Sequence, residues 1–431
     1  MIEPMETPPA GTAPTPPAPR STSEPAAAAR RPGRSTVKWV LLLGALATLP
    51  AFTVDMYLPS LPDVAADLDA SPALAQLTLA GMLVGGAFGQ LVIGPLSDRY
   101  GRRAPVIIGL ALHVVTSVLC AVVPTIGWLI VLRVLQGFFN ASAQVVSIAV
   151  IRDRFTGSDA ARILSRLMLV IGLAPLLAPT IGSFVAGHGD WRWVFWVLAV
   201  LGLVLGLVVL RFMPETLETE RRQVGGVGSV FRGYGALLKD RHFVALAVLP
   251  GLGMAVLMSY VVGSPFVLQE GYGLTHQQFA ALFAVNGIGL VISAQVNASL
   301  VRRVAPVRIL RVALVLQGVF AVGLFVVALT GAGGLIGLLA ALWLTLALQG
   351  LIPANASALA LTRHGERAGT AAAVIGAFQA GVAGLVSPLV GVLGGDAVAM
   401  STVMLGAVVA SLLVLGLATP AFRKGGWHLP A

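Results

Sequence analysis

Twelve long apolar runs divide this sequence, and they restrict its fold more than any other feature. Hydrophobic residues make up 57% of the chain and charged residues only 11%, whereas soluble globular domains carry about 25% charged residues. Apolar runs of about 18 residues or more are typical of membrane-spanning helices, because hydrocarbon offers no water to an open backbone. The sequence therefore predicts an all-α polytopic membrane protein. We expect spans at 38–62, 73–96, 105–123, 128–151, 162–187, 193–212, 242–268, 277–301, 308–330, 334–361, 368–393 and 398–420.

The longest internal hydrophilic segment, 213–241, separates the predicted spans into two groups of six. We expect one six-helix bundle over 38–212 and a second over 242–420, with 213–241 as a cytoplasmic loop between them. Residues 1–37 are rich in Pro and Ala and contain no apolar core segment, so they are predicted to form a disordered cytoplasmic tail. Residues 421–431 are expected to form a second cytoplasmic tail.

The distribution of basic residues predicts the orientation. With the N-terminus inside, 26 of the 28 Lys and Arg residues fall on the cytoplasmic side, as the positive-inside rule requires. Of the other two, Arg192 lies outside and Arg133 lies within the fourth span. The net charge of +10 therefore follows from topology, and we expect no nucleic-acid partner.

A short charged segment, Gly94–Arg103, joins the second and third spans. We interpret it as a glycine-hinged turn that forces the two spans to lie as antiparallel neighbours. It carries three arginines, with Asp98 among them in need of a partner. A partial copy of this segment at Asn297–Pro306 ends the eighth span. It has an Arg pair and a following Pro but lacks the aspartate, so the two halves resemble each other.

Two ionisable residues lie inside predicted spans, where each is by default a functional hypothesis. Asp55 is 17 residues beyond Lys38, roughly 25 Å along a helix. Arg133 enters from the other side, just below Trp128, so both are expected in the outer half at similar height. The two side chains could face each other or line one cavity; a structural ion pair between spans one and four is the alternative.

Polar side chains follow one face of the fourth span. They recur at steps of three and four residues, which is the spacing of one helical stripe. Such a stripe needs water, partner side chains or substrate inside a membrane, and we favour a cavity over interhelical hydrogen bonding. For single amides in the other half both interpretations stay open. The stripe is Arg133, Gln136, Asn140, Gln144 and Ser147, and the single amides are Asn286, Asn355 and Gln379.

Two prolines four residues apart, Pro175 and Pro179, interrupt the fifth span. Each lacks a backbone N–H, so we expect a kinked helix. Ala178 and Gly182 permit close packing beside them.

These motifs together resemble the major facilitator superfamily of transporters, and within it the drug–proton antiporter group with twelve spans, of the bicyclomycin-resistance (Bcr/CflA) type. The similarity extends over about 38–420. The matching segments are 55–62 in span one, 94–103 between spans two and three, 132–137 in span four, 174–183 in span five, and 353–361 in span ten. In the span-five segment, Ala178 and Ser183 stand where glycines are usual.

The resemblance implies the major facilitator fold, two pseudo-symmetric six-helix bundles that work by alternating access. It also implies that small amphiphilic drugs or toxic compounds are exported in exchange for protons, with the proton gradient as energy source and no cofactor or metal. Burial disfavours a charged carboxylate and a nearby cation favours it, so Asp55, tuned by Arg133, is expected to take up and release the proton. The substrate cavity is expected to include Phe52, Met56, Tyr57, Gln136, Asn140, Gln144, Asn286, Asn355 and Gln379, and the span-five antiporter motif Pro175, Ala178, Pro179 and Gly182.

The resemblance implies that the charged turn is a conformational latch. Asp98 is expected to pair with Arg152 or Arg154, or to approach the amide end of span eleven near 368–370. The expected latch residues are Gly94, Asp98, Arg99, Gly101, Arg102 and Arg103.

The expected setting is a bacterial cytoplasmic membrane, with both termini inside and the chain a monomer in the lipid bilayer. Export of an endogenous metabolite, or proton-coupled uptake on the same scaffold, fits the same residues. A polytopic membrane enzyme is a distant alternative, because the six histidines are scattered without a nucleophile set, metal cluster or phosphate loop. We therefore expect a transporter and not an enzyme.

Overall fold

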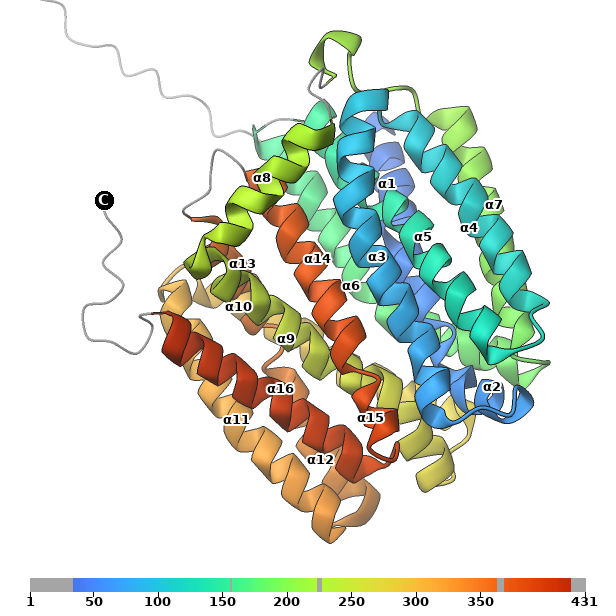
Figure 1. Cartoon of the computed structure of the whole chain (residues 1–431), viewed down its shortest axis with the longest axis vertical. Coiled ribbons are helices and arrows are strands. Elements are labelled where there is room, and N and C mark those ends of the chain that lie inside the picture. The colour runs from blue at the N-terminus through green and yellow to red at the C-terminus, as the bar shows by residue number, and fades with distance from the viewer. Residues whose placement is uncertain (1–33, 156, 223–226, 363–367, 420–431) are drawn as a thin grey trace, which may run out of the picture.

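The computed structural model describes residues 34–155, 157–222, 227–362 and 368–419 (Figure 1). Regular structure in these ranges is entirely helical, and twelve helices in them are long and apolar enough to cross a membrane. These helices confirm the predicted all-α polytopic fold. Of the two predicted tails, residues 1–33 and 421–431 lie outside the described residues.

Each half of the chain contributes six of the spans, some of them in more than one helical piece. The N-terminal half consists of α1 (Arg34–Asp55), η1 (Leu58–Ser60), α2 (Leu61–Asp67), α3 (Pro72–Tyr100), α4 (Arg103–Ala121), α5 (Ile126–Arg154), α6 (Gly157–Gly187) and α7 (Arg192–Phe212). The connection holds η2 (Thr219–Arg221) and α8 (Val227–Lys239). The C-terminal half consists of α9 (Arg241–Pro265), η3 (Phe266–Gly271), α10 (His276–Leu300), α11 (Pro306–Thr330), α12 (Gly334–Ala347), α13 (Ile352–Leu361), α14 (Ala368–Val386), α15 (Leu389–Val392) and α16 (Ala397–Ala418).

Side-chain caps define several helix starts. Ser71, Asp240 and Asp396 accept hydrogen bonds from the first backbone N–H groups of α3, α9 and α16. Thr275 and Gln278 form a reciprocal capping box at the start of α10. These caps satisfy donors that a helix leaves open at its N-terminus.

The two halves pack against each other through matching helices. α3, which holds span two, contacts α14 of span eleven, while α6 of span five contacts α10 of span eight. Exchanging the halves converts one contact into the other, because span eight corresponds to span two and span eleven to span five. In Figure 1, α3 and α14 run side by side between the blue-to-green helices and the yellow-to-red ones. This arrangement is the predicted pair of pseudo-symmetric bundles.

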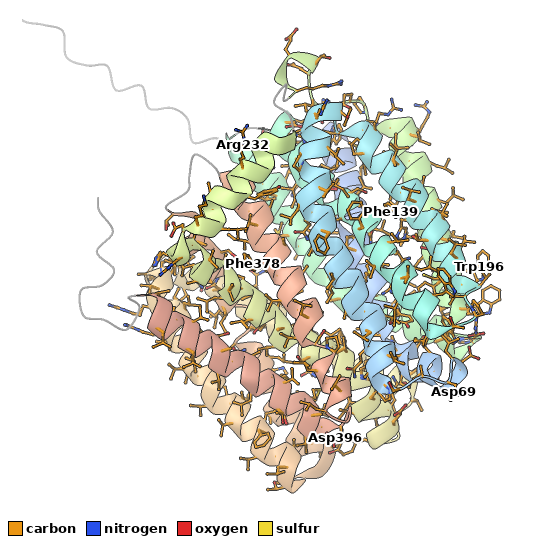
Figure 2. All side chains as sticks on the ribbon, in the orientation of Figure 1. Asp69, Phe139, Trp196, Arg232, Phe378 and Asp396 are labelled. Carbon is orange, nitrogen blue, oxygen red and sulfur yellow. The ribbon has the colours of Figure 1, made fainter. Side chains whose placement is uncertain are left out.

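Three labelled charged residues mark the two ends of the bundle. Figure 2 shows Arg232 of α8 at one end and Asp69 and Asp396 at the other. We call the end that carries Arg232 and the turn between α3 and α4 the basic end, and the opposite one the far end.

The predicted turn between spans two and three is shorter than expected. α3 continues as a helix through Gly94 to Tyr100, so only Gly101 and Arg102 lie between α3 and α4. Gly101 has φ of +93°, a conformation that favours glycine.

The helix tolerates Pro95 because a partner replaces the missing hydrogen bond. Pro95 cannot donate to the carbonyl of Leu91 four residues earlier, and the hydroxyl of Tyr234 donates to that carbonyl instead, at 3.1 Å. Tyr234 belongs to α8, a helix within the segment 213–241 that we had expected to be a loop.

Within the N-terminal half, α3 and α5 touch backbone to backbone. A Cβ atom added at Gly137 would overlap the carbonyl of Met82, and one added at Gly85 would overlap the carbonyl of Val134. The crossing therefore requires glycine at both positions.

We predict that Gly137→Ala destabilises the protein by about 1–3 kcal/mol, the usual cost of overpacking. The matched control is Gly323→Ala in α11, where an added Cβ meets nothing within 4 Å and alanine is the better helix former. Thermal unfolding of the two purified variants in detergent tests this. Equal melting temperatures for both variants would contradict the close crossing.

Candidate functional site

The first span breaks at Asp55, and a buried arginine caps the broken end. Because α1 stops at Asp55, the carbonyl of Thr53 has no helical partner. Arg133 Nη2 of α5 donates to that carbonyl at 3.2 Å. A cation at the C-terminus of a helix also interacts favourably with the helix dipole.

The remaining contacts of Arg133 are an amide and two aromatic rings. Its Nη1 donates to Gln136 Oε1 at 2.6 Å, and its guanidinium lies 4.9 Å from the ring centre of Tyr57 and 5.6 Å from that of Phe195. The side chain is completely buried. Cation–π contacts gain strength when the cation is desolvated, so these rings help to hold the buried charge.

Other members of the span-four stripe bond to neighbouring helices of the same half. Gln136 donates to Ser117 Oγ of α4 at 2.7 Å, and Asn140 donates to Thr53 Oγ1 of α1 at 3.0 Å. In this structure they therefore act as interhelical hydrogen-bonding groups. Their predicted place in a substrate cavity stays a prediction.

Asp55 and Arg133 do not form an ion pair. The carboxyl of Asp55 is buried at 6% exposure, and the described residues offer it no hydrogen-bond or ion-pair partner. The structural ion pair considered as an alternative is thus not present in this structure. A buried carboxyl without a counter-ion is costly when charged, which makes Asp55 an unusual residue in this half.

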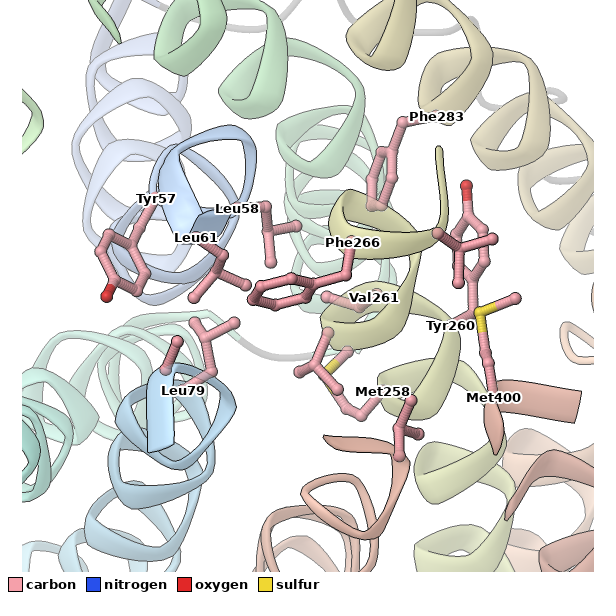
Figure 3. Close-up of a cluster of buried hydrophobic side chains, with 14 of the residues drawn as sticks. Tyr57, Leu58, Leu61, Leu79, Met258, Tyr260, Val261, Phe266, Phe283 and Met400 are labelled. Atoms are coloured by element: carbon pink, nitrogen blue, oxygen red, sulfur yellow. The ribbon is translucent and has the colours of Figure 1, made fainter. Parts of the chain in front are cut away.

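Three predicted cavity residues next to Asp55 belong to the hydrophobic contact between the halves. Met56 and Tyr57 are fully buried there, and Phe52 is partly buried against the same cluster. Figure 3 shows Tyr57 near Leu61 from one half, with Phe266 approaching from the other.

Two predicted amides of the C-terminal half are paired within that half. Asn286 donates to the hydroxyl of Tyr260 at 3.0 Å. Asn355 donates to Asn297 Oδ1 and to the carbonyl of Leu351, both at 2.7 Å. A role of either amide in substrate binding stays a prediction.

Polar contacts join the halves at the far end. Gln269 donates to the carbonyl of Pro59 at 3.1 Å, and Ser183 donates to the carbonyl of His276 at 2.9 Å. The backbone N–H of Gly391 donates to Gln76 Oε1 at 2.8 Å. Together with the hydrophobic cluster, these contacts close the far end.

The span-five motif takes part in this closure. α6 is one continuous helix that includes Pro175 and Pro179. Ala178 is fully buried in the hydrophobic cluster, and a Cβ atom at Gly182 would overlap the backbone of Met56. The small residues therefore let α6 approach the broken end of span one.

A cavity of about 710 Å³ extends inward from the basic end. It lies between α3 and α5 of one half and α14 of the other, next to α8. Gln144 and Gln379 line it as predicted cavity residues, together with Gly94, Asp98 and Arg102 of the charged segment. Further lining residues are Gln90, Pro95, Ser97, Val145, Ile148, Ala149, Arg152, Asp153, Tyr234, Gly369, Thr370, Ala372, Ala373 and Gly376.

Asp98 pairs with Arg102, which corrects our expectation of Arg152 or Arg154. Asp98 also lines the same cavity as Gly369 and Thr370, and its predicted approach to the start of α14 stays a prediction. Arg102 Nη1 donates to Asp98 Oδ1, and its Nε donates to Asp153 Oδ2 of α5 at 2.7 Å. The physical reason is the tight turn: because α3 remains helical to Tyr100, Arg102 folds back onto the last turn of α3. Arg102 thereby ties α3 to α5.

Glu215 completes this end of the N-terminal half, and our sequence analysis missed it. Its carboxylate accepts hydrogen bonds from the backbone N–H groups of Arg102 at 2.8 Å and Arg103 at 3.1 Å, where α4 begins. Burial raises the pKa of Glu215, but backbone hydrogen bonds from Leu217, Arg102, Arg103 and Thr216 outweigh it and lower the pKa. The only feature of the sequence that could have indicated this role is the position of Glu215 just after span six, with a proline before it.

Comparison with known proteins agrees with this architecture. The sequence profile described as Major Facilitator Superfamily matches residues 40–388. An uncharacterized MFS-type transporter, YdgK of Bacillus subtilis (strain 168), is 35% identical over 388 residues, which is 89% of this chain and 96% of that protein.

Two further relatives carry names that refer to resistance. The bicyclomycin resistance protein homolog of Haemophilus influenzae is 32% identical over 87% of this chain and 94% of its own length. The multidrug resistance protein MdtL of Escherichia coli O157:H7 is 31% identical over 58% of this chain and 63% of its own length.

Solved structures match the fold. The xylose transporter XylE from E. coli has a TM-score of 0.69 at 15% identity, covering 89% of this chain and 97% of that one. The nucleoside transporter NupG has a TM-score of 0.72 at 14% identity, covering 90% of this chain and 100% of that one.

We predict that Arg102→Met lowers the free energy of unfolding by about 1.5–3 kcal/mol, the range for hydrogen bonds to charged groups. The substitution leaves the carboxylates of Asp98 and Asp153 near each other without their shared cation. The control is Arg162→Met, which removes an exposed ion pair with Asp159 and is expected to cost less than about 1 kcal/mol. Thermal unfolding at neutral pH measures the loss of stability in both variants. A smaller loss for Arg102→Met than for Arg162→Met would refute the assignment of Arg102 as the stabilising partner of Asp98 and Asp153.

Proposed function

This chain belongs to the Major Facilitator Superfamily, whose members are transporters rather than enzymes, and we propose that it exports small amphiphilic compounds in exchange for protons. The names of the relatives from H. influenzae and E. coli support drug efflux. The proposed cycle is alternating access, in which the halves rock about a site between them.

We propose proton coupling because the carboxyl of Asp55 is buried and has no hydrogen-bond or ion-pair partner among the described residues. Such a group binds a proton when it is enclosed in a low-dielectric environment and releases it when water or a cation reaches it. Asp55 ends α1 at the closed far end, where the halves meet. When the halves part there, its surroundings change, and that change is what a proton switch requires.

Arg133 supports the switch through the backbone of span one. It bonds the carbonyl of Thr53, two residues before Asp55. A movement of α1 against α5 therefore alters the position of Asp55 relative to a fixed positive charge. Next to Asp55, Phe52, Met56 and Tyr57 offer apolar surface for dissimilar ligands once the halves separate.

We place the basic end in the cytoplasm of a bacterial inner membrane, with both termini on that side. The distribution of 26 of 28 basic residues supports this orientation. The cavity that begins at Asp98 then takes up substrate from the cytoplasm, and opening of the far end releases it outside. Export of an endogenous metabolite and proton-coupled uptake use the same parts, and the choice of compounds in the test distinguishes them.

The segment Gly94–Arg103 is proposed to act as a conformational latch. In this state Arg102 connects α3 with α5, while Asp98 lines the cavity opposite the start of α14. When the basic end closes, α14 approaches this cluster, and the pairing of Asp98 then decides which state is favoured.

We predict that Asp55→Asn abolishes proton-coupled efflux while leaving the protein folded, because an amide cannot exchange the proton. A susceptibility panel in an efflux-deficient host, including bicyclomycin and unrelated drugs, compares wild type with the variant. Proteoliposomes then report substrate-dependent proton flux. The control is Asp69→Asn, which removes an exposed carboxylate whose φ of +45° asparagine also tolerates.

Substrate-dependent proton flux that persists in Asp55→Asn would refute the proton-coupling assignment. Resistance to no compound in the wild type would favour metabolite export or uptake over drug efflux.

We predict that Asp98→Asn changes the ratio of inward-open to outward-open protein and slows transport by about tenfold or more. A tenfold change in this ratio corresponds to about 1.4 kcal/mol. Spectroscopic distances between labels on α3 and α14 at the basic end measure the ratio. An unaltered distance distribution together with an unaltered transport rate would exclude the latch.

A further inference from the structure

A groove of about 340 Å³ lies on the flank of the C-terminal half, near the basic end. The end of α8, the first two turns of α9 and the end of α16 enclose it, and these three parts lie close together on the left side of Figure 1. Its lining residues differ from those of the larger cavity between the halves. Its volume falls in the range of small-molecule and cofactor sites.

One face of α9 supplies both a charge and an apolar surface to this groove. Its lining residues follow one another at steps of three, one and three, which is a single helical stripe: Arg241, Val244, Ala245 and Val248. Arg241 is the first residue of span seven, and Val248 lies roughly 10 Å further along the helix. The groove therefore runs from the membrane interface into the hydrocarbon, with the arginine at its mouth.

The other walls of the groove are apolar and reach the surface of the protein. Leu238 of α8 and Val414 of α16 complete the lining. Leu238 is 50% exposed, and next to Val414 the side chains of Leu413 and Leu417 are exposed as well. These exposed leucines indicate that the groove opens toward lipid, where its apolar walls can cover an acyl chain.

Arg241 is available to bind a ligand. Its side chain is exposed, and it has no hydrogen-bond or ion-pair partner among the residues that the structure describes. The neighbouring carboxylate of Asp240 instead accepts hydrogen bonds from the backbone N–H groups of His242 and Phe243, where it caps α9. A free guanidinium can bind a phosphate through two parallel hydrogen bonds.

The charge around the mouth of the groove complements an anionic headgroup. Within 227–362 and 368–419, the basic end carries seven Lys and Arg residues but one carboxylate, that of Asp240. Glu270 and Asp396, the other acids of these ranges, lie at the far end. The seven basic residues are Arg232, Lys239, Arg241, Arg302, Arg303, Arg308 and Arg311.

We propose that this groove binds one anionic phospholipid, with the phosphate on Arg241 and an acyl chain along Val244, Val248 and Val414. A phospholipid already lies in the bilayer with its phosphate at the interface, and basic pockets between spans on the cytoplasmic side suit anionic headgroups. The site goes beyond the proposed function, because it does not depend on which compound the protein transports.

The lipid also affects α8. It contacts Leu238 and so holds the end of this helix against α9 and α16. From the same helix, the hydroxyl of Tyr234 donates to the carbonyl of Leu91 in the N-terminal half. The bound lipid therefore supports the connection that α8 makes between the halves.

Native mass spectrometry of the purified full-length protein tests the site. The probes are phosphatidylglycerol, which is anionic, and phosphatidylcholine with identical acyl chains, which has no net charge. We expect wild type to bind one phosphatidylglycerol at least fivefold more tightly than phosphatidylcholine. Arg241→Gln should raise the Kd for phosphatidylglycerol about fivefold, as expected for the loss of one basic residue at an anionic headgroup.

Two pairs of variants separate the groove from the rest of the surface. Arg308→Gln removes an exposed arginine of α11 at the same end but outside the groove lining, and it should leave the Kd unchanged. Val248→Phe fills the groove without changing its charge and should raise the Kd about three- to tenfold. Its control is Val319→Phe, at a position of α11 that is 61% exposed. Thermal unfolding without added lipid confirms that each variant is folded.

Equal binding of the two lipids, or equal effects of Arg241→Gln and Arg308→Gln, would show a general lipid coat and refute the site. Displacement of phosphatidylglycerol by equimolar inorganic phosphate would refute a lipid as the occupant. A wild type that forms dimers in place of lipid-bound monomers would assign the groove to a second copy of the chain. Because these measurements involve no transport, a failure of proton-coupled efflux leaves the lipid site standing.

Discussion

Open backbone groups must find donors inside a membrane, and this structure repeatedly satisfies them with side chains from distant parts of the chain. The carbonyl of Thr53, freed where α1 ends, accepts from Arg133. The carbonyl of Leu91, freed by Pro95, accepts from Tyr234. Each bond permits an irregular backbone and connects that part of the chain to another helix.

The same requirement explains why the two ends of the molecule differ in this state. At the far end, Gln269 reaches the carbonyl of Pro59 across the boundary between the halves, beside a large hydrophobic cluster. At the basic end, charged groups bond mainly within the N-terminal half, through Arg102 and Glu215. A cavity can therefore persist between the halves at the basic end, while the far end is closed.

Sequence reasoning predicted the spans well because hydrophobic run length depends only on local composition. It also predicted Gln144 and Gln379 as cavity residues; both line the cavity at the basic end, and their contact with a substrate stays a prediction. It was wrong about the partner of Asp98, because α3 continues as a helix past Pro95, where the hydroxyl of Tyr234 donates to the carbonyl of Leu91, 143 residues earlier in the chain. Glu215 was missed for a similar reason, since its contact with Arg102 joins residues 113 apart. Local patterns do not encode such distant pairings.

Residue counts place Asp55 and Arg133 at a similar depth, which stays a prediction, and they left open whether the two side chains form an ion pair. A charge in hydrocarbon can be satisfied by carbonyls and aromatic rings as well as by an opposite charge. Arg133 uses the former, which leaves Asp55 free of a permanent counter-ion. A proton switch depends on this separation, since a permanent ion pair would hold the carboxylate charged in every state.

The charged cluster and the cavity between the halves share their helices. Arg102 ties the end of α3 to Asp153 near the end of α5, while Asp98 and Asp153 both line the cavity. Gly369 and Thr370 at the start of α14 line the same cavity from the other half. Because packed helices move as rigid units, any displacement of α14 toward α3 at the basic end would change the surroundings of Asp98.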